Sequence, residues 1–330
     1  RYDLDDETAL RSEFSGNKAT NNSHYHVEFS EVQNLTDTST DRNSPITLPS
    51  ITVEKTGKGF IEGHILKTKI HANHIWQDLG HDVSRWNIQQ TNFNSHENKL
   101  GIFENEIGYL GSIYQVNKRN DSFTNTGEVI RANIHASSAW RRYYNYTVNK
   151  KSLIFEPKIK LTFIGGDDKN NDIPNRDSAD FRIDSANMFL TNRFQGYDYV
   201  LPGARADIGL SAFTNSKILG SLHGFAGVSR RHTGEVPSGL TAGNDKDLSD
   251  YVATVSAEKE NLYVLSWSGR INSTSSNLDE SRAKFSANIL NTKLTVAHTQ
   301  LTQNYFTSAD GDLEEATVSV SQSLNNNINL

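Results

Sequence analysis

The sequence lacks cysteine and has no long hydrophobic run. With no cysteine among its 330 residues, it can form neither a disulfide framework nor a thiolate metal site. A hydrophobic content of 35% and a mean hydropathy of -0.60 are too low for a helical membrane protein. The longest apolar run, residues 262–265, is far shorter than the ~20 residues of a spanning helix. Transmembrane helices are therefore excluded, whereas strands that cross a membrane alternate in polarity and hardly raise hydropathy.

Charge of neither sign is in large excess. Lys and Arg number 33 and Asp and Glu 39, which gives a net charge of -6 and a pI near 6.0. Because binding to nucleic acid depends on a surplus of cations, we expect no nucleic-acid partner. The sequence also contains no phosphate-binding glycine loop, nucleophile elbow or zinc-protease motif. We therefore expect no enzyme activity, no cofactor and no metal site.

What the sequence does contain is alternation of apolar and polar residues, which is clearest from residue 130 onward. Between Ile130 and Trp140 the even positions are apolar or small, and the odd positions include Arg131 and Asn133. A strand of this length can cross a bilayer at a steep tilt. Pro157 lies on the apolar face of its segment, and because proline has no backbone N–H we expect it at a bulge or an unpaired position. Further alternating segments cover residues 153–163, 204–212, 222–228, 251–255, 263–267, 285–289, 294–296 and 318–320.

Short and long connections alternate between these segments. Residues 214–217, 258–261 and 290–293 form short connections, and residues 229–250, 269–281 and 299–315 form long ones. Outer-membrane barrels are built this way, with short turns on the periplasmic side. At about 20 residues per strand and connection, the chain supplies about 14–16 strands. The sequence therefore predicts an all-β, antiparallel transmembrane β-barrel, part of a large outer-membrane barrel, with residues 165–202 on its extracellular side.

The two faces of the predicted strands differ in charge. The apolar face carries almost no charge, as expected where Lys or Arg would cost about 2–4 kcal/mol against lipid. The opposite face would then line the lumen of the barrel. The cations on that face are Arg131, Lys158, Lys160, Arg205, Arg282 and Lys284. A second interpretation is that these cations only solvate a polar face.

A dense polar segment, residues 172–210, carries a distinctive order of residues. Its motif consists of Ile173, Pro174, Asn175, Asp177, Ser178, Asp184, Asn187, Phe189, Asn192, Arg193, Phe194, Gly196, Asp198, Gly203, Arg205 and Gly209. The segment resembles the LptD family of lipopolysaccharide-assembly proteins. Three positions depart from the family pattern: Arg176 stands where an acid is typical, Tyr199 where Arg is typical and Leu201 where Glu is typical. Ion pairs built from those three side chains are therefore not expected.

The resemblance implies a function in lipopolysaccharide transport and assembly at the outer membrane of a Gram-negative bacterium. In this family the lipid arrives from a periplasmic bridge protein (LptA-like) through an N-terminal β-jellyroll domain. A plug lipoprotein (LptE-like) sits inside the barrel. The lipid leaves sideways between the first and last strands, and the sugar leaves through the lumen. Cations in the lumen would attract the phosphate groups of the glycolipid.

We expect residues 1–330 to form a single β-barrel region of a longer protein. The first residues contain no apolar leader, and residues 325–330 do not read as a finished strand. No part of the sequence is assigned to a jellyroll domain, and the sheet is expected to be open or incomplete. Three other interpretations remain open at this point: a generic outer-membrane porin-type channel, a surface adhesin, and a soluble secreted β-sandwich or carbohydrate-active enzyme.

The role of the motif segment has two interpretations. In the first, its polar side chains fasten the segment to the barrel through bonds to the backbone, and Gly196 and Gly203 adopt turn conformations. The side chains concerned are Asn187, Asn192, Arg193, Asp198 and Arg205. In the second, the folded segment caps or narrows the lumen and shapes the exit route. The two interpretations are compatible.

Overall fold

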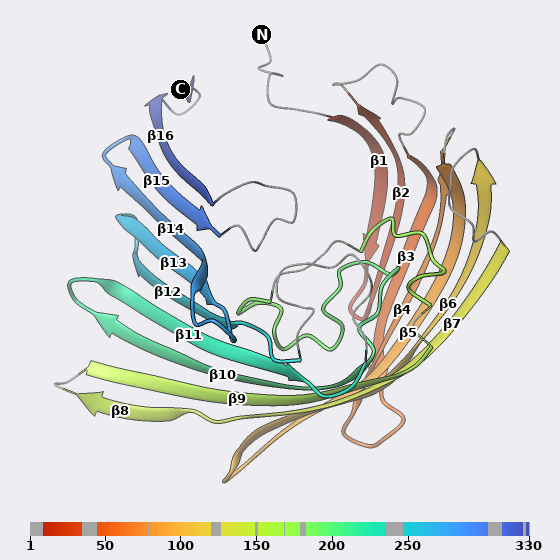
Figure 1. Cartoon of the computed structure of the whole chain (residues 1–330), viewed down its shortest axis with the longest axis horizontal. Helices are drawn as coiled ribbons and strands as arrows, with labels where there is room; N and C mark the ends of the chain where they lie inside the picture. Colours follow the sequence, from red (N-terminus) through yellow and green to blue (C-terminus); the bar gives the residue numbers. More distant parts are fainter. Residues whose placement is uncertain are drawn as a thin grey trace.

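The computed structural model is one antiparallel β-sheet that curves strongly around a concave side (Figure 1). It describes residues 9–34, 45–77, 80–119, 127–148, 151–167, 169–178, 183–234, 247–302, 312–325 and 328–329. Within these residues the sheet has 17 strands. No helix in the described part of the chain is long and apolar enough to cross a membrane. The predicted all-β, antiparallel fold class is confirmed.

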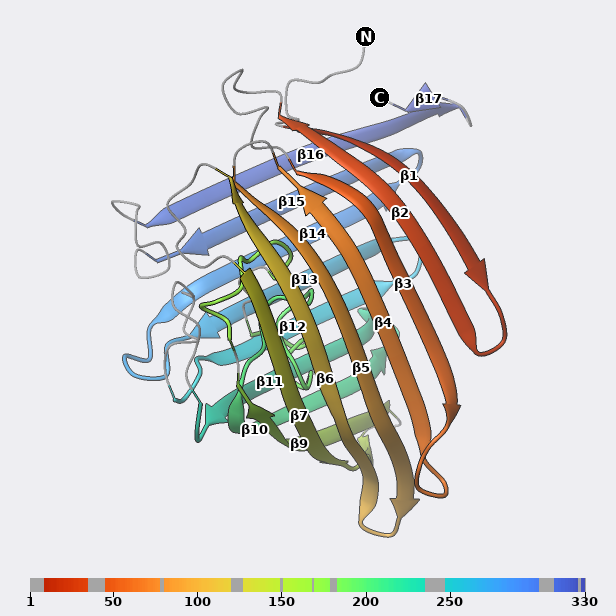
Figure 2. The ribbon, with the colours of Figure 1, turned by 90° about the vertical axis from the view of Figure 1, so that its right-hand side faces the viewer.

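The strands follow one another around the sheet in chain order, each antiparallel to its neighbour (Figure 2). The first half comprises β1 (Ala9–Ala19), β2 (Ser23–Asn34), β3 (Ile46–Lys58), β4 (Ile65–Trp76), β5 (Gly80–Asn98), β6 (Gly101–Arg119), β7 (Gly127–Arg141), β8 (Tyr144–Val148) and β9 (Lys151–Gly166). The second half comprises β10 (Gly203–Ser216), β11 (Gly220–Arg231), β12 (Tyr251–Lys259), β13 (Tyr263–Ile271), β14 (Leu278–Ile289), β15 (Thr292–Leu301), β16 (Leu313–Asn325) and β17 (Ile328–Asn329). Among the described residues β1 pairs only with β2, and β16 only with β15 and β17, so these strands end the sheet.

Strand β8 is a continuation of β7, because both pair with β9. Arg141 of β7 lies opposite Lys158 of β9, and Tyr144 of β8 lies opposite Phe155 of β9. Pro157 therefore faces the break between the two strands, where its missing N–H disturbs no ladder on that side. This confirms the irregularity expected at Pro157. Since β17 is also very short, the number of full-length strands falls within the predicted range.

The connections alternate in length as predicted. Residues 217–219, 260–262 and 290–291 form short turns, whereas residues 167–202 and 232–250 form long connections. Two connections on the long side are shorter than the rule suggests, residues 77–79 and residues 272–277. The second is shorter than the predicted 269–281 because β13 and β14 extend further toward that end of the sheet.

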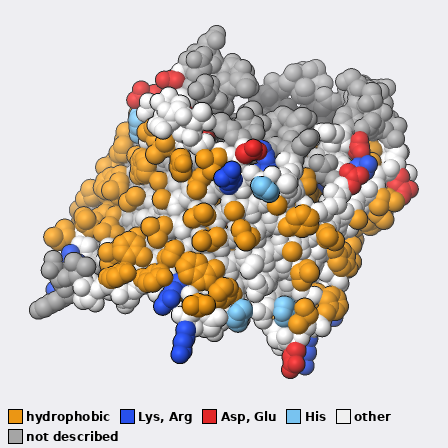
Figure 3. All heavy atoms as spheres, turned by 60° about the horizontal axis from the view of Figure 1, so that its bottom comes forward, with side chains coloured by type: hydrophobic (Ala, Val, Ile, Leu, Met, Phe, Trp, Pro, Cys, Tyr) orange, Lys and Arg blue, Asp and Glu red, His pale blue; other side chains and the backbone are white. Residues whose placement is uncertain are grey.

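The two faces of the sheet meet different surroundings. On β7, Ile130 and Ile134 are 62% and 61% exposed on the convex face, whereas Arg131 and Asn133 are 1% and 3% exposed on the concave face. Hydrophobic side chains cover much of the convex face, and charged ones gather toward its margins (Figure 3). A soluble β-sandwich would bury such an apolar row against a second sheet. An outward apolar face and an inward polar face are what a transmembrane β-barrel requires.

Candidate functional site

The candidate site is built around residues 167–202, which connect β9 to β10 and are called the inner segment below. Figure 1 shows this segment, in green, on the concave side of the sheet rather than extending away from it. A short turn at residues 184–187 shapes it locally. The Asp184 carboxylate accepts the N–H groups of Ala186 and Asn187 at 2.8 and 2.9 Å, and the Asn187 amide oxygen accepts the Asp184 N–H at 2.9 Å. Such side-chain-to-backbone bonds favour turns over strands.

A second set of bonds folds the inner segment back on itself. The Asp177 carboxylate accepts the backbone N–H groups of Tyr197 and Asp198 at 3.0 and 3.2 Å. The Ser178 hydroxyl accepts the N–H of Tyr199 at 3.0 Å. Gly196 precedes these residues with φ +81°, and a Cβ there would lie 2.3 Å from Asp177 Oδ1. Only glycine satisfies both the conformation and the close approach.

The β5 anchor, defined as Arg85 with Asp177 and Asp198, fixes the fold-back to the sheet. Arg85 donates to Asp198 Oδ1 at 2.7 Å and lies 2.8 Å from Asp177 Oδ2. Burial and the Asp177 carboxylate raise the pKa of Asp198, although Arg85 opposes this. Burial would also raise the pKa of Asp177, but Arg85 and the Tyr197 N–H outweigh it and lower that pKa. One guanidinium thus holds two carboxylates, of which Asp198 is buried and Asp177 is half-buried.

Arg131 of β7 binds the same fold-back through its backbone. Its guanidinium donates to the carbonyl oxygens of Asp198 and Tyr197 at 2.6 and 2.5 Å. The Tyr114 hydroxyl donates to the Tyr197 carbonyl at 2.9 Å. The ring of Tyr197 stacks on His71 of β4 with centroids 4.2 Å apart and planes 7° apart. Four neighbouring strands, β4 to β7, therefore hold this end of the inner segment.

The β10 anchor, defined as Asp207 with Arg193, Arg205 and Ser229, fixes the other end. Arg193 and Arg205 both donate to the fully buried Asp207 carboxylate, and Ser229 donates to it at 2.6 Å. Arg193 also donates to the Met188 carbonyl at 2.9 Å. Burial and the neighbouring Arg205 lower the pKa of Arg193 to about 10, against the opposing effect of Asp207. The Arg193 guanidinium therefore stays charged at neutral pH beside this carboxylate.

Further bonds join β9 and β10 to the middle of the inner segment. Lys160 donates to the Phe189 carbonyl and the Thr191 hydroxyl, both at 2.9 Å. Arg205 donates to the carbonyls of Leu190 and Thr191, the latter at 2.7 Å. Thr191 in turn donates to the Glu106 carboxylate. Cationic side chains of the sheet therefore donate hydrogen bonds to backbone carbonyl oxygens of the inner segment.

The six cations predicted on the polar face have different surroundings. Arg131, Lys160 and Arg205 are buried beneath the inner segment. Lys158 lies 4.9 Å from the Phe189 ring centroid and 3.6 Å from Glu104. On the distant strand β14, Arg282 pairs with Glu280 at 2.6 Å, and Lys284 makes no contact with the inner segment among the described residues. The structure therefore brings four of the six to the inner segment and leaves Arg282 and Lys284 apart.

An apolar cluster supports the polar anchors. It comprises Ile183, Met188, Phe194, Leu201, Phe225 and Val252, with Phe189 and Tyr199 packed against it. Two of the departures from the family pattern lie here, because Leu201 is buried and the Tyr199 ring packs edge-on against Phe194 at 5.5 Å. Gly209 of β10 allows the approach of Phe189, whose Cζ would lie 2.9 Å from an added Cβ. Apolar contacts thus occupy positions where the family pattern has charged residues.

The remaining motif residues serve the internal structure of the segment. Asn192 donates to the Tyr199 carbonyl at 3.1 Å, and Asn175 donates to the Ser178 carbonyl at 2.7 Å. Ile173 joins a second buried cluster, and Pro174 is buried as well. Gly203, with φ +106°, begins β10.

Arg85, Tyr114, Asp207 and Ser229 were missed by sequence reasoning. Arg85 lies in the first hundred residues, where the alternation is weak, and the alternation around Asp207 indicates only a polar face. A charged residue at an inward position of a predicted strand indicates the polar face, but it does not show which residue of the inner segment that side chain contacts.

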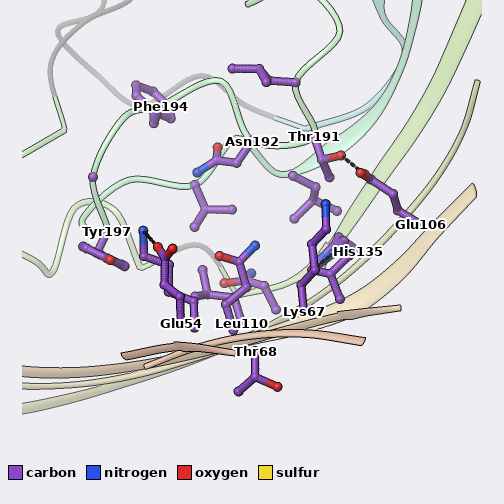
Figure 4. Close-up of a pocket in the computed structure, with 18 of the residues that line it drawn as sticks. Glu54, Lys67, Thr68, Glu106, Leu110, His135, Thr191, Asn192, Phe194 and Tyr197 are labelled. Carbon is purple, nitrogen blue, oxygen red and sulfur yellow. Dashed lines mark hydrogen bonds and ion pairs between the residues drawn. The ribbon is translucent and has the colours of Figure 1, made fainter. Parts of the chain in front are cut away.

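A cavity of about 470 Å³ lies between the inner segment and the concave face of β3 to β7. In Figure 4, Tyr197, Asn192 and Phe194 approach it from the inner segment, and Lys67, Glu54 and Leu110 approach it from the strands. Lys69, also on the wall, pairs with Glu54 at 3.0 Å. The cavity therefore offers cations, amides and an aromatic ring beside the carboxylates of Glu54 and Glu106, a lining that suits a polar ligand.

Comparison with known proteins identifies the family. A family model described as LptD, LPS transport system D, matches residues 2–328, nearly the whole chain. No curated protein matches the sequence. The motif segment, the outward apolar face and the matched length agree with one another. The chain therefore belongs to the LptD family and forms an outer-membrane β-barrel of lipopolysaccharide transport and assembly.

Proposed function

We propose that the concave face lines the lumen through which the sugar of lipopolysaccharide passes, and that the inner segment is a fixed cover that narrows this passage. The observation that carries the proposal is the double fastening of the segment by the β5 and β10 anchors. Removing one partner of an ion pair buried this deeply strongly destabilises a protein, because the other charge is left without a partner. The cover cannot move away from the sheet without separating these pairs, so it is held in one position. The passage then runs past the segment rather than through it.

In this proposal the cations divide into two groups with separate roles. Arg131, Lys160 and Arg205 are occupied by carbonyl oxygens of the inner segment, so they position the cover. Lys67 and Lys69 line the cavity and would attract the phosphate groups of the arriving lipid. The motif side chains thus have a structural role that also shapes the exit route.

The proposal includes the rest of the transport system. Residues 1–330 form a single barrel region without enzymatic activity, located in the outer membrane of a Gram-negative bacterium. A plug lipoprotein similar to LptE occupies the lumen, and a periplasmic bridge protein similar to LptA delivers the lipid. The long connections, including the inner segment, belong to the extracellular side, because short turns face the periplasm in such barrels.

Photocrosslinking in the whole protein tests the passage. Probes replace Lys67 or Lys69 on the concave face, and Ile107 or Val255 on the convex face, which is in contact with membrane lipid. The concave probes should capture lipopolysaccharide only while transport is energised, whereas the convex probes should capture lipid regardless of energy supply. Equal, energy-independent capture at all four positions would show that the concave face is not the passage.

A further inference from the structure

A groove on the convex face lies directly opposite the β10 anchor. Its floor and walls come from two rows of outward side chains that cross four strands in register. The first row is Ser138, Leu161, Ala206 and Arg230, and the second is Ala136, Phe163, Ala204 and His232. The cavity volume is about 770 Å³. Sites for small ligands commonly measure about 300–1,000 Å³, so the groove is large enough to hold part of a lipid.

The groove exists because small and large side chains alternate along the rows. Ala204 and Ala206 of β10 lie between Leu161 and Phe163 on one side and the long side chain of Arg230 on the other. The Phe163 ring is fixed over Gly165, where an added Cβ would lie 2.9 Å from the ring. The depression is therefore a property of the sequence of β10.

Bulky residues close the groove toward the short turns. The adjacent row consists of Trp140, Ile159, Ile208 and Val228. An apolar chain that enters from the membrane would thus lie against Leu161 and Phe163 and end against Ile159 and Ile208. The groove is open to the surrounding lipid and is bounded toward the short turns by this bulky row.

Arg230 gives the groove a charged end. It is exposed at the end of β11, and its guanidinium makes no ion pair within the part of the chain that the structure describes. Outward positions 130–140 of β7, 153–165 of β9 and 204–216 of β10 carry no charge. Arginine binds phosphate through two parallel N–H bonds and is less costly near the membrane interface than at the midplane. A cation at this position therefore matches an anionic headgroup above an apolar chain.

We propose that the groove binds a membrane lipid with an anionic phosphate headgroup, with one acyl chain over Ala204 and Ala206 and the phosphate on Arg230. Exposed His232 flanks the headgroup. This site lies outside the barrel wall and is separate from the transport passage. Charge and shape select the ligand together, because the acyl chain fills an apolar depression and the phosphate neutralises the Arg230 guanidinium at its edge.

The test uses the whole protein in phosphatidylcholine vesicles that contain phosphatidylglycerol with a photoreactive group on one acyl chain. Labelling should concentrate on peptides from β9 and β10 that contain Phe163 and Ala206. The Arg230→Gln variant should lower this labelling by about fivefold, because it removes the charge-assisted phosphate bonds. The Ala206→Phe variant should lower it to a similar extent by filling the groove.

Two matched controls accompany the variants. Lys217→Gln removes a cation from the opposite end of the same hairpin, and Ala226→Phe enlarges another outward alanine, so both should label as the parent protein does. Heat-modifiable migration confirms that each variant is folded. Equal labelling by a photoreactive diacylglycerol, or no loss in Arg230→Gln, would overturn the proposal. The vesicles contain no lipopolysaccharide, so failure here leaves the proposed transport passage unaffected.

Discussion

Arg85 of β5 and Asp198 of the inner segment are 113 positions apart in the chain, yet Arg85 Nη1 and Asp198 Oδ1 lie 2.7 Å apart. Asp177 Oδ2 lies 2.8 Å from Arg85 Nη2, so the same guanidinium contacts both carboxylates. The two carboxylates also accept backbone N–H groups of the inner segment, so a single guanidinium links the sheet to the turn geometry of the cover. The position of the cover therefore depends on this contact.

Arg85→Met should destabilise the inner segment by about 3–5 kcal/mol, because the buried Asp198 carboxylate and the half-buried Asp177 carboxylate would lose their cation. The measurement is urea denaturation of the whole protein in detergent, followed by the fluorescence of the tyrosines and tryptophans. Arg282→Met is the control, since Arg282 is half exposed and its buried partner Glu280 keeps a second cation, Arg270, at 3.7 Å. Equal stability of the two variants would show that the β5 anchor does not hold the segment.

Gly196→Ala should cost about 1–3 kcal/mol, because alanine is strained at positive φ and its Cβ would collide with Asp177. Thermal unfolding in detergent measures the effect. Gly224→Ala is the matched control on β11, where the nearest atom to an added Cβ is 4.0 Å away. A similar loss in both variants would mean that the fold-back tolerates a side chain at residue 196.

Alkaline pH should loosen the inner segment through Tyr197. Burial raises the pKa of Tyr197 above its ordinary value of 10.0, even though Lys69 and Arg85 oppose the shift. Because the folded pKa is the higher one, the stabilisation is complete below the unfolded pKa and is lost as pH rises through the folded pKa. Tyr197→Phe should remove this loss above about pH 10, as monitored by limited proteolysis. Tyr146→Phe, which alters an exposed phenol, should keep the parent's profile.

Asp207→Asn should release the β10 end of the inner segment, since two buried guanidiniums would share no carboxylate. A loss of about 3–5 kcal/mol is expected when one partner of a buried pair is removed. Trypsin cleavage after Arg193 should increase while the barrel keeps its heat-modifiable migration. Asp247→Asn is the control, because Asp247 is 88% exposed in its pair with Arg231, and such pairs contribute about 0–1 kcal/mol. Unchanged cleavage in Asp207→Asn would contradict the role of the anchor.

The strands could be predicted from sequence because their signal is local. Alternation at Ile130, Arg131 and Ile134 specifies a strand and its two faces within a few residues, and Pro157 marks its own irregularity. Connection lengths are also a local signal, and they indicate which ends of the strands face the periplasm. The short connection between Trp76 and Gly80 shows the limit, since nothing in the composition distinguishes a short connection on the long side from one on the short side.

The site was only partly predictable. Gly196 and Asp198 could be recognised through the motif, and Arg131 could be assigned to the polar face. Their partners could not, because Arg85 lies in a weakly patterned region and contacts depend on how far the sheet curves. The polar face was expected to present its cations to the passage. The inner segment covers two of these cations, Arg131 and Arg205.

By itself, the sequence determined that this chain builds an antiparallel barrel wall with one apolar and one polar face, since period-two alternation depends only on neighbouring residues. Only the tertiary structure decided that residues 167–202 fold inward and that Arg85, Arg193 and Asp207 fasten them. The reason is physical: a buried charge is stable only beside its partner, and curvature of the sheet, not sequence distance, brings the partners together.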